Sequence, residues 1–382
     1  MSASTIFIYV QHLLGVGHLK RAALLARAMV AQGLQVTLAS GGPAVPGMAL
    51  DGVAFVQLPP ASATDLSFKA LMDEHGRAVD EAWKRRRTAA LLEAWRASAP
   101  QVLVLELYPF GRRQMRFELL PLLEAADAAP RRSSIVCSVR DILGGQRSRE
   151  RQAETLALVE RYFDHVLVHG DPGVIAFERT FPDAARIAAR IEYTGYVVDS
   201  IPSGGDAGSA EVIVSVGGGA VGARLLETAI RAKPLCILRD RTWRMLAGGN
   251  LPDEDFRKLA ACASGVELER SRADFTTLLT NCELSISQAG YNTLLETVQA
   301  RARAVVVPFA GGSETEQTLR AACFAERGLL EILDETALSP PALAAAIDRA
   351  ARRPRPLPGA IDLDGARKSA ALVARWAAER PA

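Results

Sequence analysis

Short apolar runs rich in β-branched residues alternate along this chain with longer helical patterns, and this alternation most constrains its fold. The runs are IFIYV, VTLAS, VAFVQL, VLVLEL, SIVCSV and HVLVHG in the first half, then EVIVSV, LCILR, LSIS and AVVVP in the second. Strands that are apolar on both faces are typical of parallel sheets covered by helices. We therefore expect an α/β protein.

The chain opens twice in the same way, which predicts two domains. IFIYVQHLLGVGH opens the first half and EVIVSVGGGAVGA the second, and each predicts a buried strand, a glycine-rich turn and a helix. Between the halves, SIPSGGDAGSAE contains only turn formers. A length of 382 residues also exceeds one ordinary domain. We expect two Rossmann-like domains facing each other across a cleft, with ligands at the carboxyl ends of the strands.

The expected boundaries follow from these patterns. Residues 1–199 form the first domain, 200–210 the linker and 211–360 the second domain. The prolines of RRPRPLPG cannot continue a helix. The last segment, 361–382, contains ARKSAALVARWAAER, which predicts a helix that packs on one of the domains, the N-terminal domain being one candidate.

Composition excludes several functional classes. The 45 basic and 43 acidic residues leave a net charge of +2, so no overall field favours nucleic acid as a partner. The five cysteines lack any CxxC spacing, which argues against a zinc site or a disulfide framework and favours a reducing cytoplasm. No apolar stretch reaches the ~18 residues that a spanning helix needs, so we expect a soluble or peripheral protein. The sequence leaves the oligomeric state open.

The glycine turn of the second half is a candidate phosphate site. In SVGGGAVGA, Gly217, Gly218 and Gly219 let backbone amides approach a ligand closely at a helix start. No GK[ST] follows, so this is not a Walker A motif. A plain tight turn is an equal alternative.

The strongest motif is LSISQAGYNTLLETVQARARAVVVPFAGGSETEQTLRAACFAERG. A strand ends at Ser287, QAGYNT opens a helix, and Glu296 lies about one turn beyond Thr293. A carboxylate there could accept both ribose hydroxyls while the turn holds a diphosphate. Further on, Glu316 and Gln317 could bind sugar hydroxyls. The alternative is that Glu296 merely caps a helix and that Glu316–Gln317 is a solvated loop.

SQAGYNTLLE, VVVPF and EQTLRAACF together resemble the donor half of GT-B glycosyltransferases. The particular resemblance is to the branch containing the peptidoglycan N-acetylglucosaminyltransferase that makes lipid II. In the first half the resemblance rests on the GVGH turn and its helix. It implies an enzyme of the hexosyltransferase type that moves a sugar from a nucleoside diphosphate, by resemblance uridine diphosphate, to a hydroxyl acceptor.

The resemblance also implies roles for individual residues. Glu296 would hold the ribose, the stretch from Gly290 to Thr293 the diphosphate, and Gln317 the transferred sugar. The full expected donor-binding set is Gly217, Gly218, Gly219, Gln288, Gly290, Tyr291, Asn292, Thr293, Glu296, Glu316 and Gln317. The transfer is expected to invert the anomeric configuration. No DxD-like carboxylate pair stands in a convincing place, so we expect no cofactor and no obligatory metal.

His18 is the candidate general base, because it lies where the first helix begins, on the acceptor side. The positive end of a helix disfavours imidazolium and keeps the ring able to accept a proton. The alternatives are that His18 caps a turn or contacts phosphate, and that Glu106 or Asp141 is the base. The expected acceptor-side residues are Gly15, Gly17, Arg140 and Asp141. His12 is expected to be structural.

One alternative concerns contact with a membrane, and two concern the function as a whole. The helix EAWKRRRTAALLEAW, residues 81–95, could contact an anionic membrane surface, although a solvated helix with buried tryptophans is favoured. A nonhydrolysing nucleotide-sugar 2-epimerase would share the architecture but needs more acid and base residues than can be assigned. A catalytically inactive nucleotide-sugar-binding protein is the third.

Overall fold

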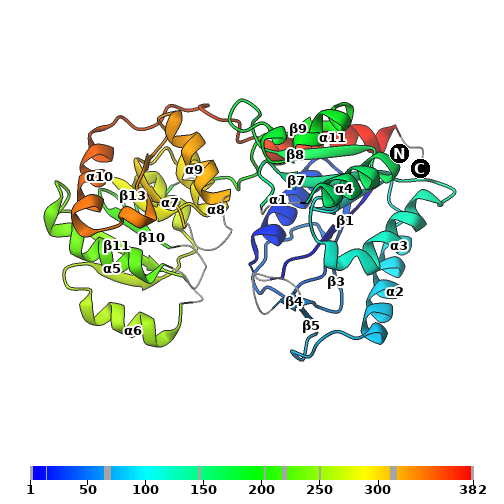
Figure 1. The fold of residues 1–382 in the computed structure, drawn as a ribbon, viewed down its shortest axis with the longest axis horizontal. Coiled ribbons are helices and arrows are strands. Elements are labelled where there is room, and N and C mark those ends of the chain that lie inside the picture. Colours follow the sequence, from blue (N-terminus) through cyan, green and yellow to red (C-terminus); the bar gives the residue numbers. More distant parts are fainter. Residues whose placement is uncertain are drawn as a thin grey trace. The chain divides into compact units, whose positions relative to one another are not determined.

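The protein folds into two compact α/β units, shown in Figure 1. The computed structural model describes residues 3–13, 15–63, 70–144, 148–201, 204–216, 222–248, 251–309 and 316–379. Unit 1 comprises Met1–Val198 and Asp362–Ala382, and unit 2 comprises Asp199–Ile361. The chain therefore leaves unit 1, builds unit 2 and returns to unit 1.

Unit 1 contains a seven-stranded parallel sheet in the order β3-β2-β1-β6-β7-β8-β9. Its strands are β1 (Thr5–Val10), β2 (Gln35–Ser40), β3 (Ala54–Gln57), β6 (Val102–Glu106), β7 (Ser134–Arg140), β8 (His165–His169) and β9 (Ile191–Tyr193). Alternate residues of β1 enter two different cores, because successive side chains point to opposite faces. Phe7 and Tyr9 pack on one face, and Ile6 and Ile8 on the other. Both faces are therefore buried, as the apolar runs predict.

Helices pack on the two faces of this sheet and complete the two cores of unit 1. They are α1 (Gly17–Ala31), α2 (Glu81–Ser98), α3 (Arg116–Asp127), α4 (Arg149–Tyr162) and α11 (Gly365–Ala378). Short 3-10 segments span Arg113–Met115, Phe177–Arg179 and Pro182–Arg190, and a two-stranded sheet joins β4 (Ser62–Ala63) to β5 (Leu71–Met72). Trp83 and Trp95 of α2 are buried, as expected for a solvated helix that packs its tryptophans inward.

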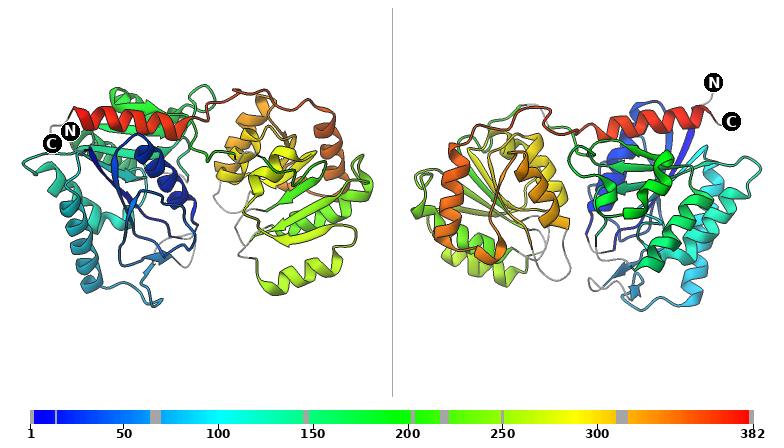
Figure 2. Two further views of the ribbon diagram at one scale, coloured as in Figure 1. Left: turned by 180° about the vertical axis from the view of Figure 1, so that it is seen from behind. Right: turned by 45° about the horizontal axis from the view of Figure 1, so that its top comes forward.

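Helix α11 packs beside α1 on unit 1, although it follows unit 2 in the sequence (Figure 2). Its Trp376 stacks on His165, with ring centroids 3.8 Å apart. At the return point, Tyr196 N donates to Asp362 O and Gly365 N donates to Tyr196 O. A Cβ on Gly365 would lie 2.4 Å from Gly195 O, so only glycine fits where the departing and returning segments meet.

Unit 2 contains a six-stranded parallel sheet in the order β12-β11-β10-β13-β14-β15. The strands are β10 (Val212–Ser215), β11 (Trp243–Ala247), β12 (Glu267–Arg270), β13 (Leu284–Gln288), β14 (Ala304–Val307) and β15 (Glu331–Ile332). The helices are α5 (Ala223–Ala232), α6 (Asp253–Cys262), α7 (Phe275–Asn281), α8 (Tyr291–Gln299), α9 (Glu316–Glu326) and α10 (Pro340–Arg352). Short 3-10 segments span Lys233–Leu235 and Glu335–Ala337. The predicted α/β class with two Rossmann-like domains is confirmed.

One predicted strand is wrong. The run LCILR forms a turn after α5, with Leu235 and Ile237 exposed, and the strand is β11 a few residues later. Arg244 interrupts the apolar pattern of β11 and hides the strand from periodicity. Its guanidinium forms ion pairs with Glu211, Glu267 and Glu269, which makes a cation acceptable near the start of this strand.

The segment between the two predicted domains packs on unit 2 where it is described. Asn281 Nδ2 donates to the carbonyl oxygens of Gly205 and Ala207 at 3.0 Å. A Cβ on Gly208 would lie 2.8 Å from the backbone of Leu278. Residues 204–208 therefore follow the surface of α7.

Candidate functional site

The start of α1 brings His18 against Glu106, the last residue of β6. Glu106 is 1% exposed, and its Oε1 lies 2.8 Å from His18 Nδ1. Arg21, three residues after His18 on the same face of α1, also donates to Glu106 Oε1 through Nη2. The N-cap residue of α1 is Val16, whose side chain makes no capping hydrogen bond. The carboxyl ends of β1 and β6 thus meet in a buried cluster of an imidazole, a carboxylate and a guanidinium.

Burial and ion pairing fix the charges of this cluster. Burial lowers the pKa of His18 to about 4, against the opposing influence of Glu106. Burial alone would raise the pKa of Glu106, but the charges of His18 and Arg21 outweigh it and hold that pKa well below its usual range. At neutral pH the imidazole is therefore neutral and the carboxylate ionised.

This charge state determines the tautomer of His18. An ionised carboxylate only accepts hydrogen bonds, so Nδ1–H must donate to Glu106 Oε1. The proton-free nitrogen is then Nε2, which has no hydrogen-bond partner among the described residues. The side chain is 19% exposed. His18 therefore presents a proton-free nitrogen whose orientation is fixed by a carboxylate, a geometry that suits general-base catalysis.

The structure links the two strongest candidates for the base. The sequence offers Glu106 as an alternative to His18, whereas the structure pairs them, with Glu106 in the orienting position. Sequence reasoning missed Arg21, although its i+3 spacing from His18 places both on one face of the helix. Arg112 adds positive charge nearby, and its Nε donates to Gln11 O at 2.8 Å.

Asp141 and the acceptor-side glycines occupy different environments. Asp141 is fully buried after β7, and its Oδ1 accepts from the amide of Ile142 at 2.9 Å. Gly15 is exposed with open space where a Cβ would lie, and Gly17 is the first residue of α1. Arg140 ends β7. These residues lie at the same edge of the sheet as His18, but the burial of Asp141 makes it less accessible to a substrate.

The other histidines at this edge have structural contacts. His169, which ends β8, is fully buried, and its ring nitrogens contact Ser138 Oγ at 2.8 Å and Thr194 Oγ1 at 2.9 Å. Burial lowers the pKa of His169 to about 3. His12 Nε2 lies 3.0 Å from Pro43 O, in line with the structural role expected for it.

A second buried ion pair in unit 1 connects the loops at this edge. Arg87 and Glu118 are both fully buried, with Arg87 Nε donating to Glu118 Oε2 at 2.7 Å. Arg87 Nη1 donates to the carbonyl oxygens of Gly41 and Pro59, and Nη2 donates to Gln11 Oε1. One side chain of α2 therefore joins the segments that follow β1, β2 and β3. The sequence shows Arg87 only as part of a basic cluster.

In unit 2 the start of α8 has the geometry of an anion site. Gln288 ends β13, and Gly290 is the N-cap of α8 and has no side chain with which to cap the helix. The first turn contains Tyr291, Asn292 and Thr293 and no acidic residue. The first backbone N–H groups of a helix have no intrahelical partner and carry the positive end of its dipole. Glu296 is partly buried in the second turn of α8, beyond the capping positions.

The two polar residues at the start of α9 already have protein partners. Glu316 forms an ion pair with Arg320 Nη1 at 2.9 Å, and Arg320 is fully buried. The Arg320 guanidinium also lies 4.7 Å from the ring centroid of Tyr291, so it connects α9 to α8. Gln317 Oε1 accepts from Phe309 N at 3.3 Å. The solvated-loop alternative is therefore wrong for Glu316. The predicted residues Gly217, Gly218 and Gly219 lie outside the described residues.

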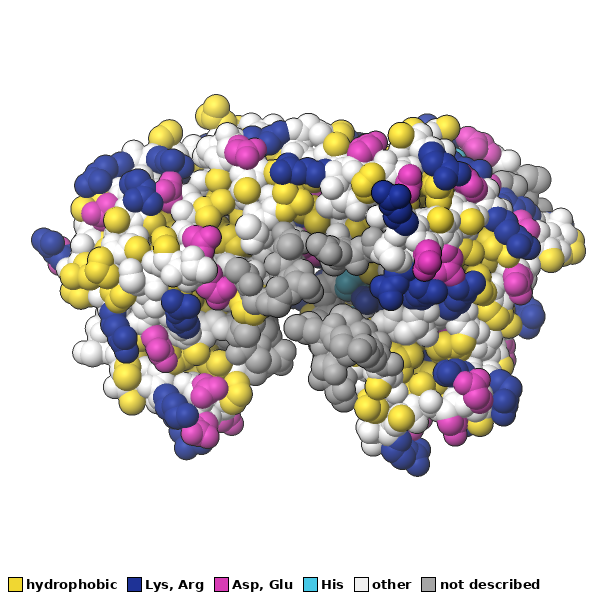
Figure 3. All heavy atoms as spheres, viewed as in Figure 1, with side chains coloured by type: hydrophobic (Ala, Val, Ile, Leu, Met, Phe, Trp, Pro, Cys, Tyr) yellow, Lys and Arg dark blue, Asp and Glu magenta, His cyan; other side chains and the backbone are white. Residues whose placement is uncertain are grey.

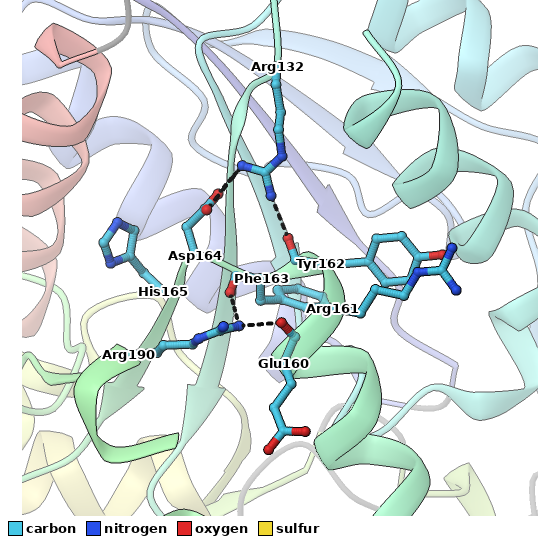
Figure 4. Close-up of a pocket in the computed structure, with 8 residues that line it drawn as sticks. All are labelled: Arg132, Glu160, Arg161, Tyr162, Phe163, Asp164, His165 and Arg190. Atoms are coloured by element: carbon cyan, nitrogen blue, oxygen red, sulfur yellow. Dashed lines mark hydrogen bonds and ion pairs between the residues drawn. The ribbon is translucent and has the colours of Figure 1, made fainter. Parts of the chain in front are cut away.

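The cavities described in the structure lie apart from the candidate site residues at the starts of α1, α8 and α9. One of about 320 Å³, shown in Figure 4, is lined by residues around the end of α4 and the start of β8. Its Arg132 binds Asp164 and Tyr162 O, and its Arg190 binds carbonyl oxygens at the end of α4, including Phe163 O. These arginines are structural groups at the end of a helix.

Two broader features of the described residues bear on ligands. No three His, Cys, Asp or Glu side chains are grouped there so that they could hold a metal ion. No helix in the same residues is long and apolar enough to span a bilayer. Figure 3 shows acidic and basic side chains interspersed, with a short band of Lys and Arg on unit 1, in keeping with a net charge of +2.

One protein family and several solved structures are similar to this chain. Residues 213–361 match the model of the glycosyltransferase family 28 C-terminal domain. The fold is that of the GT-B glycosyltransferases. Unit 2, which contains α8 and α9, is the part that matches. The match and the fold together support a glycosyltransferase, as the sequence predicts. No curated protein sequence matches the chain.

Solved structures resemble the whole chain. CalG4, the calicheamicin glycosyltransferase, has a TM-score of 0.59 at 17% identity, covering 99% of this chain and 95% of that one. MurG from Acinetobacter baumannii has a TM-score of 0.56 at 16% identity, covering 98% and 95%. Spinosyn rhamnosyltransferase SpnG has a TM-score of 0.59 at 17% identity, covering 99% and 96%. The MurG-like branch is one neighbour among several and is not singled out.

Proposed function

We propose that this chain transfers a sugar from a nucleoside diphosphate sugar to a hydroxyl acceptor, with inversion at the anomeric carbon. The observation that carries the proposal is the His18–Glu106 pair, a neutral imidazole held by an ionised carboxylate at the start of α1. The family match of unit 2 supports the donor half of the reaction.

In the proposed reaction His18 Nε2 removes the proton of the acceptor hydroxyl. The acceptor oxygen attacks the anomeric carbon, and the bond from that carbon to the diphosphate oxygen breaks with its electron pair. Glu106 stabilises the imidazolium that forms, because its pKa lies well below the usual range and it stays ionised. A single displacement of this kind inverts the anomeric centre.

The leaving diphosphate is assigned to unit 2. We propose that the first amides of α8, from Gly290 to Thr293, meet the developing negative charge. Glu296 would bind the ribose hydroxyls and Gln317 the transferred sugar, as the sequence resemblance implies. Uridine is the nucleoside we propose on the same basis.

The assignment of Glu316 changes in the light of its ion pair. With one oxygen engaged by the buried Arg320, Glu316 is better suited to holding the start of α9 than to binding sugar hydroxyls. It would then position Gln317, its neighbour in the first turn of α9.

We propose that no divalent metal is obligatory, because helix amides can stabilise the leaving group. Turnover should survive an excess of EDTA with unchanged kcat. Loss of turnover in EDTA that magnesium or manganese restores would contradict this assignment. We also propose a cytoplasmic location, which the five free cysteines support.

The decisive experiment separates a transferase from an epimerase and from an inactive binder. The full chain is incubated with each of several UDP-sugars, first alone and then with a panel of hydroxyl acceptors. Acceptor-dependent release of UDP with a product of inverted configuration is expected. Interconversion of the sugar nucleotide without an acceptor would show an epimerase. Tight UDP binding without turnover on any acceptor would favour the inactive binder.

A further inference from the structure

A separate cavity of about 790 Å³ lies in unit 1, between the last turns of α2 and α3. It also touches Thr5 at the start of β1, and Gln101 and Ser133 just before β6 and β7. These are the amino ends of the strands, whereas Glu106 lies at the carboxyl end of β6. A five-residue strand spans about 16 Å at ~3.3 Å per residue, so this cavity is not part of the proposed reaction site.

The size and lining of the cavity fit a small molecule with an apolar body. Ligand sites commonly have volumes of about 300 to 1,000 Å³ and mainly apolar walls. Here the walls include Ala99, Pro100, Ala125 and Ala129, together with Trp95. Trp95 is 7% exposed, and its indole N–H has no acceptor among the described residues. The apolar wall therefore contains one donor that the protein leaves unpaired, which is uncommon for a buried polar group.

The charges around the cavity have a single sign. Among the described residues, its charged lining residues are Arg96, Arg131 and Arg132, and none that lines it is acidic. Arg132 points toward Asp164 and Tyr162 in Figure 4 and is neutralised by Asp127 and Asp164. Arg96 and Arg131 are exposed, and neither has an acidic partner in the described part of the chain. Two uncompensated guanidinium groups therefore lie at an apolar cavity.

From this arrangement we infer that the cavity binds an amphiphilic anion, a molecule with an acyl chain or ring and a carboxylate or phosphate head. The apolar part fills the space between α2 and α3 beside Trp95. The anionic head binds Arg96 and Arg131, whose guanidinium groups match carboxylate and phosphate geometry. The site is independent of the proposed transfer reaction, because it lies at the opposite end of the sheet.

Calorimetric titration of the full chain with dodecyl phosphate, kept below its micelle concentration, tests the inference. Saturable binding of one molecule is expected. Inorganic phosphate tests the need for the apolar part, and dodecyl maltoside tests the need for the charge. Both should bind at least about tenfold more weakly, since each lacks one of the two interactions. Equal binding of dodecyl maltoside would overturn the assignment of an anion.

Two variants locate the binding site. Arg96→Ala with Arg131→Ala should weaken dodecyl phosphate binding about tenfold or more, because two charge-assisted contacts are lost. The matched control is Arg85→Ala with Arg86→Ala, which removes the same charge from exposed positions earlier on α2. Ala129→Phe should abolish binding by filling the cavity. Arg96 and Arg131 are exposed, and unchanged affinity in their double variant would overturn the inference.

Discussion

The two units meet the demands of one proposed reaction by different physical means. Unit 1 uses buried charged side chains at the carboxyl edge of its sheet, namely Glu106 with Arg21, and a second buried pair, Glu118 with Arg87, holds the neighbouring segments together. Unit 2 offers the start of α8, where we propose that the positive end of the helix dipole stabilises the diphosphate. Moving a proton requires a base with a set pKa, which fixed charges provide. Holding a diphosphate requires several donors at once, which a helix start provides.

The largest expected effect concerns the ion pair that unit 1 buries completely. Arg87→Met should lower the free energy of unfolding of unit 1 by about 3 to 5 kcal/mol, because Glu118 loses its buried partner. Denaturant unfolding followed by circular dichroism measures the change. Arg85→Met, at an exposed position of the same helix, should change stability by less than about 0.5 kcal/mol. UDP affinity should stay unchanged in both variants, since the donor residues lie in unit 2. Unaltered stability in Arg87→Met would contradict the role of this pair.

The next effect tests proton transfer in unit 1. His18→Ala should lower turnover by about 100-fold or more with little change in donor affinity, the loss expected when a general base is removed. Steady-state kinetics with saturating donor separates the two quantities. His75→Ala removes an exposed histidine and is the matched control. Turnover close to wild type in His18→Ala would move the role of the base to Glu106 or Asp141.

A smaller effect is expected in unit 2. Glu296→Ala should weaken UDP binding by roughly 1.5 to 3 kcal/mol, the range for hydrogen bonds to a charged group, and should leave the pH dependence of turnover unchanged. Titration calorimetry gives the dissociation constant. Glu326→Ala, which removes an exposed carboxylate at the end of α9, serves as the control. An unchanged dissociation constant in Glu296→Ala would remove the ribose assignment.

The smallest expected effect is a response to pH. Because the pKa of His18 is lowered to about 4, the imidazole stays neutral from pH 8 to about pH 5, and kcat/KM should be nearly constant over that range. Below about pH 4 the ring gains a proton, so the rate should fall as pH falls. Glu106→Gln should move the fall in rate to lower pH, since the negative charge that supports the imidazolium is removed. A limb near the ordinary histidine pKa of about 6.5 in the wild type would contradict the burial argument.

Sequence patterns predict the strands well where both faces are apolar, and less well where charge enters the core. The runs that become β1 and β14 are uninterrupted, and β6 and β7 are charged only at their last residues, Glu106 and Arg140. In contrast, β11 contains Arg244 and escapes detection because its three acidic partners are distant in sequence. The starts of α1 and α8 are predictable from glycine and the end of an apolar run. Arg87 is not, because nothing local distinguishes it from the exposed Arg85 and Arg86.

The candidate site is likewise predicted by the sequence only in part. The sequence places His18 and Glu106 at two strand ends, but only the order of the strands makes β1 and β6 neighbours and brings the two side chains together. The pairing of Glu316 with Arg320 is a different case, since an i,i+4 spacing is visible in the sequence. That spacing by itself indicates a partner for Glu316 within the protein rather than a sugar.

The return of α11 to unit 1 also sets an order of assembly. A ribosome releases all of unit 2 before the last helix of unit 1, so unit 2 can complete its core while unit 1 is still open. Until α11 arrives, the apolar face of α1 lacks Ala370, Val373 and Trp376, its partners in the mature core. Unit 1 is thus closed only after α11 has been made, and a deletion of α11 would expose a core that lies some 340 residues earlier in the chain.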